Sequence, residues 1–141
     1  MKINVIDRQK TLPISKPSVG VVLREILLYL SISCEEMSIY FVTEKKITQL
    51  HKKFFNDPTP TDCITFPVDE TYLGDLFICP EAALKYDPQN PYLELQLYVV
   101  HGLLHLKGYD DLDPKKRRIM RKMEKKCMDH LKSLKTEISP P

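Results

Sequence analysis

The stretch "HGLLHLKGYDD" carries two histidines, His101 and His105, four residues apart. On a helix, residues at this spacing project from the same face, so the two imidazoles can bind one metal ion. Gly108 permits a left-handed turn that ends such a helix and lets the chain swing back towards the histidines. Asp110 and Asp111 lie on that turn, and either can supply a third ligand. The pattern predicts a metal centre, for which zinc is the commonest ion.

A buried helix with two structural histidines is the alternative. The residues around the histidines are indeed apolar: Val99, Val100, Leu103, Leu104 and Leu106. Unpaired polar groups in such a helix are costly, and a metal ion would give both imidazoles a partner. We therefore favour the metal centre.

The spacing H-x3-H-x5-D also fits the zinc proteases of the metzincin type. In those enzymes the general-base glutamate follows the first histidine, and this chain has Gly102 there. A zinc protease without that carboxylate lacks its base, so proteolysis is disfavoured.

The rest of the sequence contains segments with the apolar spacing of helices and segments with the spacing of strands. Asn90 before Pro91, and Asp113 before Pro114, are N-cap signals for the histidine helix and for the last helix. We expect one α+β domain of residues 1–141, with a small mixed β-sheet of about four strands, about five helices and a frayed tail over about 135–141. The expected strands are 3–7, 38–43, 63–68 and 72–79, and the expected helices are 19–30, 44–55, 80–86, 91–107 and 114–134.

The composition is that of an ordinary globular protein, with 43% apolar and 28% charged residues in 141. The net charge of +2 is too small to indicate a partner. The first residues show no signal peptide, and no apolar run approaches the roughly 20 residues that span a bilayer. We expect a cytoplasmic protein without a membrane partner. Its cysteines are expected to be free thiols: Cys34, Cys63, Cys79 and Cys127.

The stretch 101–111 resembles the signature H-G-x-L-H-L-x-G-Y-D-H of the YbeY family, bacterial metal-dependent endoribonucleases of rRNA maturation. "PTDCITFP" (60–67) is similar to the family's P-T-D-V-L-S-F-P, and "LGDLFIC" (73–79) is similar to its L-G-D-I-x-I. The motifs occur in the family's order, and the similarity runs from about residue 35 to 130.

The resemblance implies that His101 and His105 bind zinc, one ion per chain. The family's third ligand is a histidine, and its position here is Asp111. Asp110 matches the family's own aspartate and is the competing ligand. A carboxylate would make the ion a weaker Lewis acid and would favour harder metals.

Two further residues receive candidate catalytic roles from the resemblance. Thr65 replaces a family serine and keeps its hydroxyl, which can contact substrate or pair within a strand. Asp75 can orient a metal ligand or only shape the cleft. The family's arginine before the P-T-D loop falls at Phe55, so Lys52 or Lys53 would have to replace it. The remaining histidines, His51 and His130, are expected to be ordinary residues of helix surfaces.

The segment 114–126 carries eight basic residues and one acid, Glu124. An apolar stripe along the same helix is expected to face the core, which leaves the basic residues in solvent. Either this face is merely solvated, or it binds RNA phosphates. The basic residues expected nearest to the turn of residues 108–111 are Lys115, Lys116, Arg117 and Arg118.

The resemblance implies a metal-dependent, single-strand-specific endoribonuclease that acts in rRNA maturation and ribosome quality control. Its substrate would be rRNA or precursor rRNA, and its partner the ribosome or the small ribosomal subunit. The main alternative is a ribosome- or RNA-binding factor whose metal is structural or weakly catalytic.

Overall fold

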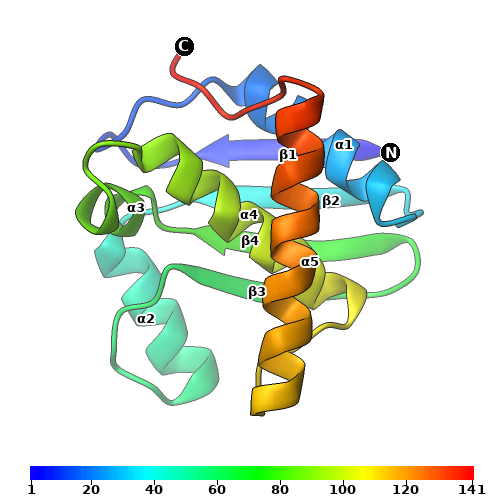
Figure 1. The fold of residues 1–141 in the computed structure, drawn as a ribbon. Coiled ribbons are helices and arrows are strands. Elements are labelled where there is room, and N and C mark those ends of the chain that lie inside the picture. Colours follow the sequence, from blue (N-terminus) through cyan, green and yellow to red (C-terminus); the bar gives the residue numbers. More distant parts are fainter.

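A computed structural model describes residues 1–141 and shows a four-stranded sheet flanked by five helices (Figure 1). The order across the sheet is β1-β2-β4-β3. β1 pairs with β2 and β2 with β4 in parallel, whereas β3 runs antiparallel to β4. The mixed sheet and the α+β class are thus confirmed. The strand bounds are Lys2–Asp7 (β1), Glu36–Phe41 (β2), Cys63–Pro67 (β3) and Tyr72–Ile78 (β4).

The helices begin at polar caps or prolines that the sequence makes visible. Thr43 and Asp113 each accept a hydrogen bond from a backbone N–H of the helix that they precede. Asn90 stands at the expected N-cap, but its side chain makes no capping bond. The helix bounds are Lys16–Tyr29 (α1), Glu44–Phe55 (α2), Pro80–Tyr86 (α3), Pro91–Lys107 (α4) and Pro114–Ser133 (α5).

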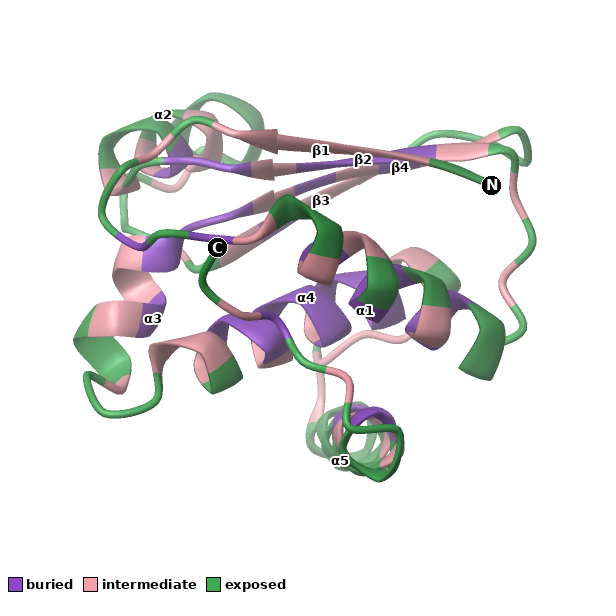
Figure 2. Ribbon diagram, turned by 90° about the horizontal axis from the view of Figure 1, so that it is seen from above, coloured by how far each residue is buried: buried purple, intermediate pink, exposed green.

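The helices form layers on the sheet. α1 and α4 lie along one face, and α5 packs on their outer side (Figure 2). On the other face, Ile47 of α2 is buried in a small cluster with Ile64 of β3. None of the helices is both long and apolar enough to cross a lipid bilayer. α4 is therefore the central helix, with the sheet on one side and α5 on another.

Gly102 brings α4 close to the sheet. A Cβ atom at this position would lie 3.0 Å from Leu76 of β4 and 3.1 Å from the Cys63 sulfur of β3. Because Gly102 lies between the two histidines of α4, this close approach sets them beside β3, an edge strand of the sheet.

The C-terminal tail packs against the domain, so the expected fraying of residues 135–141 is wrong at Ile138 and Ser139. Ile138 is only 2% exposed, and its N–H donates to the side-chain oxygen of Gln96 on α4. The Ser139 carbonyl accepts from the N–H of Ser15, and its N–H donates to the Ser18 hydroxyl. Ile138 belongs to the main core cluster, so the tail is held by an apolar side chain together with these backbone hydrogen bonds.

Candidate metal centre

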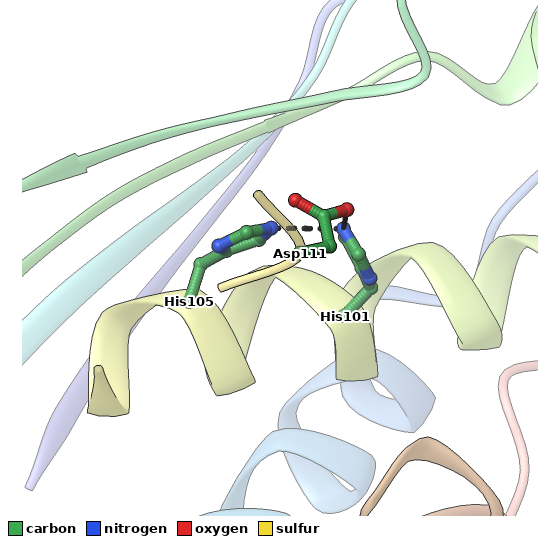
Figure 3. A group of neighbouring side chains, drawn as sticks. All are labelled: His101, His105 and Asp111. Carbon is green, nitrogen blue, oxygen red and sulfur yellow. Dashed lines mark hydrogen bonds and ion pairs between the residues drawn. The ribbon is translucent and has the colours of Figure 1, made fainter. Parts of the chain in front are cut away.

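His101 and His105 point the same ring nitrogen at one spot above α4 (Figure 3). Their Nε2 atoms lie 2.9 Å apart. Asp111 returns to the same place and puts its Oδ2 3.9 Å from Nε2 of His101. One donor atom from each residue lies within 4.8 Å of the others. The structure therefore brings together the three residues that the sequence suggested as ligands, and the chain carries a possible metal site.

The conformation of the turn after α4 shows which of the two aspartates, Asp110 or Asp111, joins the histidine cluster. Gly108 has φ +115°, the left-handed conformation that lets α4 end and the chain reverse. The side chain of Asp110 accepts from the N–H of Leu112 and lies 3.5 Å from the Lys116 ammonium. Asp110 is thus engaged with the start of α5, and Asp111 supplies the carboxylate of the cluster.

Glu124 of α5 supports the cluster from behind. The Nδ1–H of His101 donates to a Glu124 oxygen, and Nη1 of Arg121 lies 2.7 Å from both oxygens of that carboxylate. Burial alone would raise the pKa of Glu124, but the bonds from His101 and Arg121 outweigh it and lower the pKa. With Nδ1 protonated and held, Nε2 of His101 presents its lone pair to the cluster.

Glu124 received no role from the sequence, although a signal was there. It falls on the apolar stripe of α5 at helical spacing from Met120, Cys127 and Leu131, all of which are buried. Its own side chain is 6% exposed. A carboxylate on a core-facing stripe needs a hydrogen-bond donor as its partner, and His101 and Arg121 meet that need.

The donor set fits a metal ion. Ligand atoms around a tetrahedral zinc ion lie about 3.3 Å apart, given bonds of about 2.0–2.1 Å. The separations of 2.9 Å and 3.9 Å lie on either side of that value. Burial, and then the neighbouring His101, lower the pKa of His105, which favours the neutral imidazole that binds metals. Two imidazoles and a carboxylate suit zinc and also harder divalent ions.

A cavity of about 270 Å³ opens beside the two histidines. Thr65 lines it from β3, as its candidate role requires. His51 lines it as well, so its expected place as an ordinary surface histidine is wrong. The His51 Nδ1 lies 2.8 Å from the carbonyl of Thr59, in the loop that follows α2. The other lining residues are Phe55, Cys63 and Ile64.

The structure does not bring Asp75 to the cluster. Side chains alternate between the two faces of a strand, and Asp75 precedes Leu76, which packs against α4. The Asp75 carboxylate therefore lies on the opposite face, where it accepts a hydrogen bond from the Tyr72 hydroxyl at 2.6 Å. The sequence alone did not reveal on which face Asp75 lies, and its candidate catalytic role is corrected on this ground.

The basic residues at the start of α5 are all exposed: Lys115, Lys116, Arg117 and Arg118. Two of them contact the turn that carries Asp110 and Asp111. Lys116 pairs with Asp110, and Arg117 donates to the carbonyl of Asp111 at 3.3 Å. Positive charge therefore stands directly beside the cluster.

Asp62, in the P-T-D loop, is another acid near the cluster that sequence reasoning left without a role. Desolvation raises the pKa of its carboxyl, and the charge of His101 partly opposes that rise. It lines a second hollow, of about 560 Å³, together with Tyr98 of α4.

Comparison with known proteins agrees with the family resemblance of the sequence. The profile of the family described as "Endoribonuclease YbeY" matches residues 4–132. Endoribonuclease YbeY of Protochlamydia amoebophila is 41% identical, over 96% of this chain and 97% of that protein. Endoribonuclease YbeY of Chlamydia felis is 36% identical, over 91% of this chain and 89% of that protein.

A solved structure shares the fold. The solution structure of TM1509 from Thermotoga maritima superposes with a TM-score of 0.63 at 25% identity, over 92% of this chain and 88% of that one. The family profile, the curated relatives and the fold agree, and the chain belongs to the endoribonuclease YbeY family.

Proposed function

We propose that this chain is a metal-dependent endoribonuclease that hydrolyses single-stranded RNA at the cluster of His101, His105 and Asp111. Family membership assigns RNA as the substrate and endonucleolytic cleavage as the reaction. The proposed position of the active site rests on one observation: two Nε2 atoms and one carboxylate oxygen converge beside a cavity.

We propose one zinc ion per chain as the cofactor. His101, His105 and Asp111 would hold the ion, which would supply Lewis-acid activation of a phosphoryl oxygen and of water. The protein's part is to hold the ligands. Glu124 orients the ring of His101, burial lowers the pKa of His105 and so favours its neutral form, and Asp111 adds a negative charge that also suits harder ions. Thr65 offers a hydroxyl to the substrate from the cavity wall.

The RNA backbone is proposed to run along the start of α5. Lys115, Lys116, Arg117 and Arg118 are exposed there, and the turn that they adjoin carries Asp111. Exposed cations beside a cleavage site attract and position phosphates. We propose rRNA or precursor rRNA as the substrate, in maturation and quality control in the cytoplasm, with the ribosome or its small subunit as the working partner. The family to which the chain belongs supports this assignment.

Metal content and RNA cleavage, measured on the same preparations, test the proposal. Wild type should contain roughly one ion per chain and cleave single-stranded RNA. His105→Ala and Asp111→Ala should lose both properties. His130→Ala is the matched control, because His130 lies on α5 stacked on Tyr29 and takes no part in the cluster.

Two other results would redirect the assignment. Metal bound at the cluster without any cleavage would favour an RNA-binding factor with a structural ion. A wild-type protein that binds no metal would overturn the proposed centre.

A further inference from the structure

Phe55, the last residue of α2, exposes a large apolar ring at the metal centre. It is 52% exposed and lines the cavity that also contains His101, His105 and Thr65. Phe54 is equally exposed, at 54%, but it packs edge-on against Phe66 and does not line the cavity. Exposure alone is common for an aromatic residue, whereas an exposed aromatic wall beside metal-binding groups implies an occupant.

The Phe55 ring is held in place without being covered. His51 and Phe66 approach it with ring centroids at 5.8 Å and 6.1 Å, inclined by 53° and 33°. Neither neighbour forms a parallel stack on it. The next residue, Asn56, adopts a left-handed conformation with φ 54° and ends α2, which fixes where the helix presents Phe55.

The charges around the cavity indicate what kind of group it takes. No lysine or arginine lines it. The cations that contact the turn of residues 108–111 are Lys116 and Arg117, at the start of α5. A phosphate would be attracted to these two cations, so the cavity on the α2 side suits a neutral group with a flat apolar face and polar edges. Thr65 and His51 supply polar atoms for such edges.

We propose that Phe55 is a stacking platform for one unpaired nucleobase of the RNA substrate, next to the phosphodiester that meets the metal centre. This inference rests on the proposed function, because it takes RNA as the substrate. Aromatic side chains hold the bases of single strands by stacking, which works for any base because each has a π-face. The cavity of about 270 Å³ is small for a binding site, so it admits one base and not a base pair. The device would make the enzyme select single strands.

A tryptophan reporter tests base binding directly, because the chain contains no tryptophan. Phe55→Trp introduces a single fluorophore at the platform, and Phe54→Trp introduces one at the matched neighbouring position. Short oligoadenylate with uncleavable methylphosphonate linkages, added to the metal-loaded protein, should quench Phe55→Trp saturably and leave Phe54→Trp unaffected. An abasic oligonucleotide of equal length should quench neither. Equal quenching of both variants would overturn the proposal.

Kinetics supply the second test. Phe55→Ala should raise the KM for single-stranded RNA about tenfold, with kcat changed by less than about twofold, as expected for the loss of one stacked base. Phe55→Leu keeps an apolar side chain without a π-face and should lose as much. Phe54→Ala should match wild type, and circular dichroism should show that all variants are folded. A wild-type KM in Phe55→Leu would exclude stacking. A wild type that cleaves no RNA would instead refute the proposed function, while the fluorescence experiment would still decide whether a base binds.

Discussion

The Nδ1–H of His101 on α4 donates its hydrogen bond to Glu124 on α5, 23 residues further along the chain. This contact ties the two helices together at the metal centre. It also determines which nitrogen of His101 can bind a metal ion. When Nδ1 carries the proton, only Nε2 has a lone pair to offer.

Loss of the Glu124 carboxylate should weaken metal binding. We expect Glu124→Gln to lower zinc affinity about tenfold and Glu124→Ala by up to about a hundredfold, as for other residues that orient a metal ligand. Competition with a chromophoric chelator measures both. Asp129→Asn is the matched control, because Asp129 is an exposed carboxylate of the same helix that pairs with Lys125. Unchanged affinity in Glu124→Ala would show that His101 needs no orienting partner.

Replacement of Asp111 by histidine should change the preferred metal. Asp111→His converts two imidazoles and a carboxylate into three imidazoles, which suit zinc better than manganese. The ratio of zinc to manganese affinity should rise about tenfold, a change of about 1.4 kcal/mol. Parallel titrations with the two ions measure it, and a ratio that does not move would indicate that Asp111 does not bind the ion.

Replacing two helical glycines by alanine should change the free energy of unfolding in opposite directions. Gly102→Ala pushes a methyl group against Leu76 and Cys63, and the overpacking of about 1–3 kcal/mol should exceed the gain in helix propensity of about 1 kcal/mol. Gly20→Ala meets no atom within 4 Å and should stabilise the protein by up to about 1 kcal/mol. Urea denaturation gives both free energies of unfolding. Equal stabilisation by the two changes would mean that α4 can move away from the sheet at little cost.

The docked tail should contribute to stability. Ile138→Ala removes a side chain that is 2% exposed and should cost about 2–5 kcal/mol in free energy of unfolding. The matched control is Ile119→Ala on α5, where the side chain is 43% exposed and the loss should stay below about 1 kcal/mol. Similar losses at the two positions would show that the tail detaches in solution.

The basic start of α5 should give RNA binding its salt dependence. Replacing Lys115, Lys116, Arg117 and Arg118 by glutamine should lower the slope of log affinity against log salt by about 0.7 for each phosphate that the protein no longer neutralises. A control variant should remove the same charge elsewhere, at exposed Lys2, Arg8, Lys10 and Lys16. If the control reduces the slope as much, the effect belongs to net charge and not to this surface.

Local signals in the sequence predict much of the fold. Pro91 at the start and Gly108 after the end predict the observed bounds of α4. The i,i+4 spacing and Gly108 place the histidines and the returning turn, because both depend only on neighbouring residues. What could not be predicted depends on how distant elements meet: the contact of Glu124 with His101, the face on which Asp75 lies, the entry of His51 into the cavity and the docking of Ile138.

The close packing of α4 also limits which amino-acid substitutions this enzyme can accept during evolution. α4 is constrained by the sheet at Gly102, by the core at Leu103 and Leu104, and by the two histidines of the candidate metal centre. Few substitutions on it can leave both folding and chemistry intact. α2 and α5 each border the centre with exposed residues, Phe55 on one and Arg117 on the other. New substrate preferences are therefore expected to arise through these two flanking helices, while the helix that carries His101 and His105 stays fixed.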